Sequence, residues 1–95
     1  MTVEELRLEL EKIIENLNSS SFASINAPFI EKLEKLSASA AELEMKQGKQ
    51  LIDNLVGAIR AINEGKSQTA SGMIRLTALD FYVKKLSGSD NTEEL

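Results

Sequence analysis

Apolar residues recur at helical spacing along almost the whole 95-residue chain. This periodicity is the sequence feature that constrains the fold most strongly. In the first stretch the apolar residues alternate in steps of three and four: Val3, Leu6, Leu10, Ile13 and Leu17. Because an α-helix has 3.6 residues per turn, these steps place all five on one face. Thr2 and Glu5 have the spacing of a capping box. We therefore expect an amphipathic helix over about residues 3–18.

A second helical pattern begins at Pro28, after a Ser- and Asn-rich loop over 19–27, and continues to about residue 64. Its apolar stripe is interrupted only over 45–50, which contains Gly48. The favoured interpretation is one continuous helix over about 28–64, because no capping residue follows Gly48 and a mid-helix glycine costs only about 1 kcal/mol. In the alternative, the chain turns at Gly48 and two antiparallel helices form.

The last predicted helix covers about residues 68–87, after Gly65 ends the preceding pattern. Its apolar residues are spread around the helix and not confined to one stripe, so we expect it to be more enclosed than the first helix. Residues 88–95 are polar and acidic, and we predict a disordered tail there. The chain is thus expected to be a single helical domain over 1–87.

These elements predict an all-α fold, a small antiparallel helical bundle. With a continuous central helix there are three helices in one layer, which leaves an apolar strip exposed and favours a homodimer that covers it. The predicted interface residues lie on the central stripe: Leu33, Leu36, Ala40, Leu43, Leu51, Leu55, Ile59 and Ile62. With a turn at Gly48, four shorter helices close a bundle within one chain.

Most residue types that enzymes use for chemistry are missing, since the chain has no His and no Cys. Thiol catalysis, His-based acid–base chemistry and His/Cys metal sites are therefore excluded. The carboxylates are spread along helix faces, which indicates solvated surface. Asp53 and Asp80 interrupt apolar runs, and we expect both to face outward in surface ion pairs. We predict no catalytic residue, no cofactor and no metal site.

The charge distribution limits the partners. Fifteen acidic against eleven basic residues give a net charge of −4, which disfavours nucleic acid. No apolar run approaches the roughly 18–20 residues of a membrane span. The acidic start of the chain is unlike the basic leader of a signal peptide, so we expect a cytoplasmic protein.

The two ends of the predicted domain carry opposite charge. Residues 1–18 hold five acids and two bases (−3), whereas 65–87 hold one acid and four bases (+3). This difference suggests that the first and last helices are neighbours, within one chain or across a symmetric dimer; the alternative is a chance difference between solvated faces.

Amphipathic stripes without catalytic residue types favour a non-enzymatic helical protein–protein interaction module: a scaffold, adaptor or regulator, and a homodimer. The alternative is a chaperone or co-chaperone of an export or secretion system, which would bind an amphipathic helix of its client. An enzyme that uses carboxylates alone is the least supported function.

Overall fold

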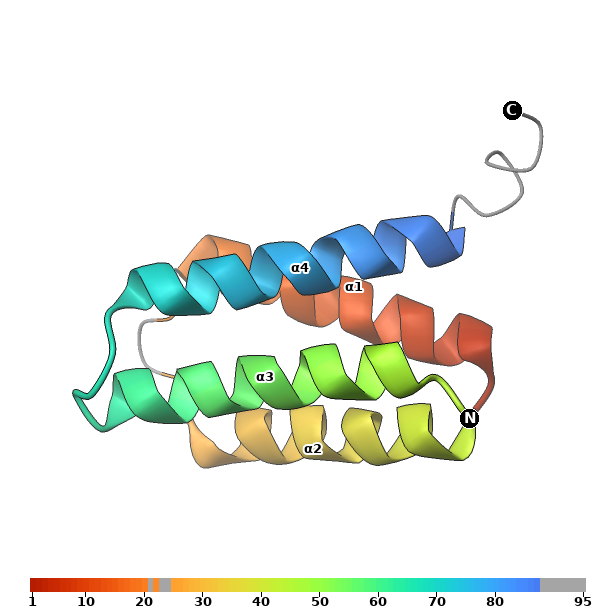
Figure 1. Cartoon of the computed structure of the whole chain (residues 1–95), viewed down its shortest axis with the longest axis horizontal. Coiled ribbons are helices and arrows are strands. Elements are labelled where there is room, and N and C mark those ends of the chain that lie inside the picture. The colour runs from red at the N-terminus through yellow and green to blue at the C-terminus, as the bar shows by residue number, and fades with distance from the viewer. Residues whose placement is uncertain (21, 23–24, 88–95) are drawn as a thin grey trace.

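The structure, a computed structural model, describes residues 1–20, 22 and 25–87. In this part of the chain it contains no strand and four helices: α1 (Val3–Ser20), α2 (Ala27–Glu42), α3 (Lys46–Asn63) and α4 (Thr69–Ser87). Successive helices run in opposite directions (Figure 1). Contacts join α1 to α2, α2 to α3, α3 to α4 and α4 back to α1. The predicted all-α antiparallel bundle is confirmed.

A turn separates α2 from α3, so the favoured prediction of one continuous helix is wrong and the four-helix alternative is confirmed. α2 ends at Glu42, and Glu44 takes a left-handed backbone conformation with φ of 62°. The backbone N–H of Met45 then donates to the carbonyl of Ala40 at 2.9 Å, which closes the turn. The turn comes before Gly48, which lies inside α3.

Gly48 allows α3 and α4 to pack closely. It is buried, and a Cβ atom there would lie 3.0 Å from both Cε2 and the hydroxyl oxygen of Tyr82 in α4. Burial raises the pKa of the Tyr82 phenol, and a hydrogen bond with the backbone of Gly48 offsets part of the rise. The glycine therefore serves a helix contact and not the predicted turn.

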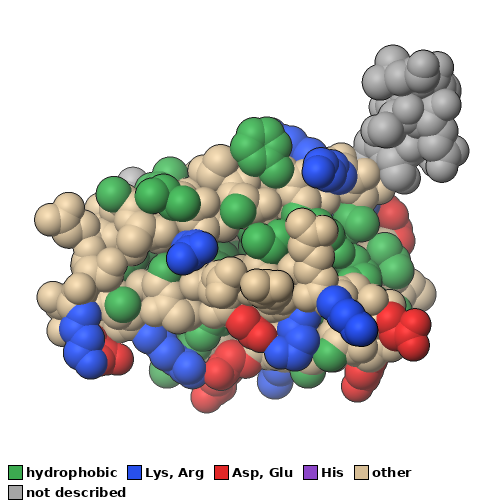
Figure 2. Space-filling view, viewed as in Figure 1, with side chains coloured by type: hydrophobic (Ala, Val, Ile, Leu, Met, Phe, Trp, Pro, Cys, Tyr) green, Lys and Arg blue, Asp and Glu red, His purple; other side chains and the backbone are tan. Residues whose placement is uncertain are grey.

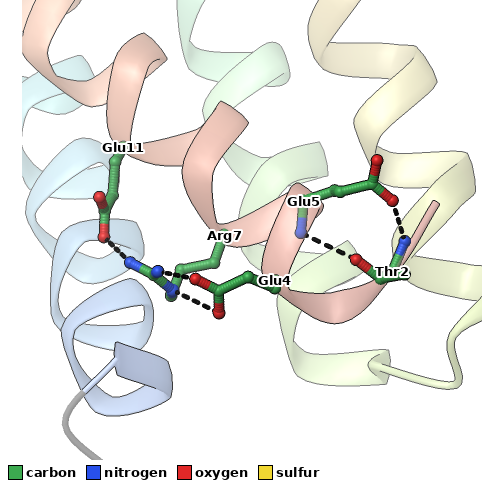
Figure 3. Close-up of polar contacts among 5 residues, drawn as sticks. All are labelled: Thr2, Glu4, Glu5, Arg7 and Glu11. Carbon is green, nitrogen blue, oxygen red and sulfur yellow. Dashed lines mark hydrogen bonds and ion pairs between the residues drawn. The ribbon is translucent and has the colours of Figure 1, made fainter.

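The helix ends follow local sequence signals. Thr2 and Glu5 form the predicted capping box, with bonds of 2.8 and 3.1 Å between the side chain of each and the backbone N–H of the other (Figure 3). Asn26 caps α2 by accepting a hydrogen bond from the backbone N–H of Phe29 at 3.0 Å. Gly65, with φ of 76°, follows the end of α3 as predicted. α1 extends two residues beyond its predicted end.

The core lies between the four helices and contains most of the predicted apolar stripes, but Val3 is 43% exposed and Ile52, outside the predicted stripe, is fully buried. The largest fully buried side chains are Leu6, Leu10, Ile13, Leu17, Leu33, Ile52, Leu55, Ile59, Leu76, Leu79 and Val83. Phe22, in the connection between α1 and α2, is only 3% exposed and packs on this core.

In the described residues, no helix has the length and apolarity to cross a membrane. The predicted polar tail over 88–95 lies outside the residues that the structure describes.

Candidate interaction surface

The residues predicted to form an interface between chains lie on α2, on α3 and in the turn between them. Five of them are buried inside a single chain: Leu33, Leu36, Ala40, Leu55 and Ile59. The other three are half-buried against the same core: Leu43, Leu51 and Ile62. A role for this set between two chains stays a prediction, and it would require the core of the bundle to open.

The two carboxylates in apolar runs form surface pairs, as predicted. Asp53 accepts hydrogen bonds from the Ser37 hydroxyl at 2.5 Å and from Lys49 Nζ at 2.6 Å. Asp80 pairs with Lys84 at 3.2 Å, one helical turn away. The hydrogen bonds from Lys49 and Ser37 lower the pKa of Asp53. Both carboxylates therefore have structural partners at the surface.

The Asp53 network predicts a loss of stability in acid. The folded state lowers the pKa of Asp53, so its ionised carboxylate stabilises the fold. This stabilisation is fully present above the pKa of Asp53 in the unfolded chain, about 4, and is lost as the pH falls through its lower pKa in the folded state. We expect Asp53→Asn to be less stable than the wild type at pH 7, with the difference shrinking below about pH 4. Urea denaturation from pH 7 to pH 3 measures this. An equal difference at every pH would contradict it.

The described residues hold no group of three or more acidic side chains that suits a metal ion. In the same part of the chain, every buried side-chain nitrogen or oxygen has a hydrogen-bond partner. The buried polar side chains of this part of the chain are therefore all satisfied within the fold.

Large apolar side chains are exposed on the outer side of α4. Ile74 is 66% exposed, Phe81 is 65% exposed and Met73 is 39% exposed. Ile74 and Phe81 are seven residues apart, so they lie on the same face two turns from each other. Hydrophobic side chains line the upper edge of the molecule, over α4, in Figure 2. We call Met73, Ile74 and Phe81 the α4 patch.

The α4 patch corrects the expectation that the last helix would be the more enclosed one. α4 occupies a corner of the bundle and buries only one stripe: Leu76, Leu79 and Val83. Met73, Ile74 and Phe81 consequently face outward. On a helical projection Ile74 and Phe81 lie opposite the buried stripe, but the structure is needed to show which stripe of α4 is buried.

Basic residues border the α4 patch. The helix carries Arg75, Lys84 and Lys85 against Asp80, a net charge of +2. Lys84 and Lys85 stand in the last turn, next to Phe81. Neither Arg75 nor Lys85 has a carboxylate within 4.0 Å among the described residues. The exposed face is therefore apolar in its middle and positive at its C-terminal end.

The outer face of α1 is acidic. Leu8, 44% exposed, stands among Glu4, Glu11 and Glu15, at spacings that share its face. The guanidinium of Arg7 pairs with both Glu4 and Glu11, and lies 2.5 Å from the carboxylate of Glu11 (Figure 3). The hydrogen bond from Arg7 to Glu4 lowers the pKa of Glu4. We call Glu4, Leu8, Glu11 and Glu15 the acidic face of α1. Since α1 contacts α4, the oppositely charged first and last helices are neighbours within one chain.

No protein-family model, curated protein or solved structure matches this chain. Its function is therefore inferred from the surface of the molecule alone.

Proposed function

We propose that the protein is a non-enzymatic protein–protein interaction module, a scaffold, adaptor or regulator, and that the α4 patch is its binding surface. The observation that supports this most is the exposure of Ile74 and Phe81, each about two-thirds open to solvent. Burying such a side chain against a partner contributes about 1.5–3 kcal/mol to the free energy of binding. Aromatic residues are also enriched at interfaces and among the residues that dominate binding.

The same surface bears on the nature of the partner. In this proposal the module is a homodimer in the cytoplasm and does not bind nucleic acid, which its net charge of −4 would repel. A chaperone for an export client remains the second candidate. The observation that favours it is the basic border of the α4 patch, which suits an acidic amphipathic helix.

Site-specific photo-crosslinking in cells of the source organism tests the proposed function. With p-benzoylphenylalanine in place of Ile74, we expect covalent adducts to protein. The matched control carries the same group in place of Lys35, which is exposed on α2, and is expected to give none. An adduct near twice 10.4 kDa indicates a second copy, and another mass indicates a different partner. Failure to form adducts at position 74 would contradict the proposal.

A further inference from the structure

We propose that the α4 patch binds the acidic face of α1 in a second copy of this chain, in a twofold dimer whose interface is the side of the bundle formed by α1 and α4. This inference rests on the proposed function, because it identifies the partner of the α4 patch. Four observations support this proposal: the distribution of the exposed apolar side chains, the opposite charges of α1 and α4, the arrangement of these two helices, and the size of the face that they form.

The large exposed apolar side chains lie on two of the four helices or just before one of them. Six large hydrophobic residues are exposed in the described part of the chain: Met1, Val3, Leu8, Met73, Ile74 and Phe81. All six lie on α1, immediately before it, or on α4. None of the six lies on α2 or α3. Large exposed apolar side chains gathered on two adjacent helices are the pattern of an interface and not of random exposure.

The charges of the helices favour α1 of the second copy, and not its α4, as the helix that the α4 patch contacts. Two α4 helices packed on each other in parallel would bring Lys84 and Lys85 of each copy together. In antiparallel packing, the same lysines would face the partially positive N-terminal end of the other α4. α1 offers the opposite sign, with five acids against Arg7 and Lys12. Glu15, on its acidic face, has no cation within 4.0 Å among the described residues. Complementary charge of this kind sets the register of an interface and suppresses wrong pairings.

The arrangement of α1 and α4 allows both contacts to form at once. The two helices are antiparallel neighbours, and the C-terminal end of α4 lies at the same end of the bundle as the start of α1 (Figure 1). A twofold axis parallel to the helices, over the line where α1 and α4 meet, places α4 of one copy on α1 of the other, and α1 of the first copy on α4 of the second. The interface is then closed and self-complementary, so no filament grows.

The register matches the apolar and charged groups. Phe81 lies six residues before the end of α4, and Leu8 lies five residues after the start of α1. At 1.5 Å per residue these offsets are about 9 and about 7.5 Å, which brings Phe81 opposite Leu8 of the second copy. Lys85 then lies near the first turn of that α1, which carries Glu4.

The face formed by α1 and α4 approaches the size of a standard protein–protein interface. Helices of 18 and 19 residues are about 27–28 Å long, and two of them side by side are about 20 Å wide. The flat projection is thus about 540 Å², and protruding side chains increase the accessible area beyond it. A standard interface buries about 800 Å² per partner, which this face approaches.

Absolute mass over a wide dilution range, with apolar variants, gives the first test. We expect the full chain to have twice 10.4 kDa at high concentration. Phe81→Ser removes two aromatic contacts per dimer and is expected to weaken it about 100-fold, with Leu8→Ser also weakening it. Both residues are exposed, so circular dichroism should show unchanged helix content. Ala41→Ser, at an exposed position of α2, is the control and should leave the dimer intact.

A charge exchange tests the pairing of α4 with α1. Lys85→Glu and Glu4→Lys should each weaken the dimer about tenfold, because each places like charges together twice. An equimolar mixture of the two variants should restore it, since both contacts of the mixed dimer are then between opposite charges. Lys35→Glu, with the same charge change on α2, should have no effect. If Phe81→Ser dissociates the dimer but Leu8→Ser and Glu4→Lys do not, pairing with α1 is wrong.

The two proposals fail in different ways. If the protein is a monomer at every dilution and position 74 forms an adduct with another protein, the proposed dimer is wrong but the proposed interaction module is not contradicted. A monomer with no adduct overturns both.

Discussion

Leu55→Ala is expected to lower the free energy of unfolding by about 2–5 kcal/mol. Leu55 is fully buried in α3, where it belongs to the core shared by the helices of one chain. Its truncation removes buried methyl groups and leaves a cavity that tightly packed neighbours fill only partly. Urea denaturation followed by circular dichroism measures the loss. Because the cavity is intramolecular, the difference from the wild type should be the same at every dilution at which both are monomers.

Phe81→Ala is the matched control, since it removes a larger side chain from an exposed position of α4. Measured on the monomer, it should change the free energy of unfolding by no more than about 0.5 kcal/mol. The opposite pattern, in which Leu55→Ala separates a dimer without destabilising the monomer, would return Leu55 to the interface predicted from the sequence.

The starts of α1 and α2 have local causes, and for that reason the capping box of α1 could be predicted. The reciprocal bonds of Thr2 and Glu5, and the cap that Asn26 provides for α2, involve residues three positions apart. Such interactions are fully specified by a short segment, whatever the rest of the chain does.

The turn between α2 and α3 could not be predicted from local signals. Glu44 holds the left-handed position that glycine or asparagine usually takes. The local backbone preferences of this segment favour a continuous helix or a turn by only about 1 kcal/mol. Burying Leu36 and Leu55 in one core contributes several times as much, so the tertiary contact decides. That contact is not visible in the spacing of one stripe.

The exposure of the α4 patch could not be predicted from the sequence for a related reason. A stripe such as the one containing Leu33 and Leu55 shows that residues are buried, but not whether the same chain or a partner covers them. In α4, apolar residues all around the helix suggested enclosure. Only the packed bundle shows that Leu79 faces the core while Ile74 and Phe81 face solvent.

Gly72→Leu is expected to destabilise the protein by about 3 kcal/mol or more. Gly72 is buried in α4, and even a Cβ atom there would come within 2.9 Å of both Ile62 Cδ1 and Phe22 Cε1. The Ile62 methyl group can move aside, but the Phe22 ring is buried and its backbone is held at φ of 66°. The larger side chain must therefore displace the connection between α1 and α2. The midpoint of urea denaturation should fall with the slope unchanged.

Gly57→Leu separates this steric effect from a general effect of replacing a helical glycine. Gly57 is exposed in α3, and a Cβ atom there meets nothing within 4 Å. Leucine should stabilise that helix by up to about 1 kcal/mol, because glycine is the poorer helix former. Phe22→Ala supplies the final test, since it vacates the space that the new side chain at position 72 needs. The double variant should lose less stability than the sum of the single variants, by at least about 1 kcal/mol. Additive losses would mean that Phe22 and Gly72 are not in contact, and the packing of α4 against the α1–α2 connection would have to be revised.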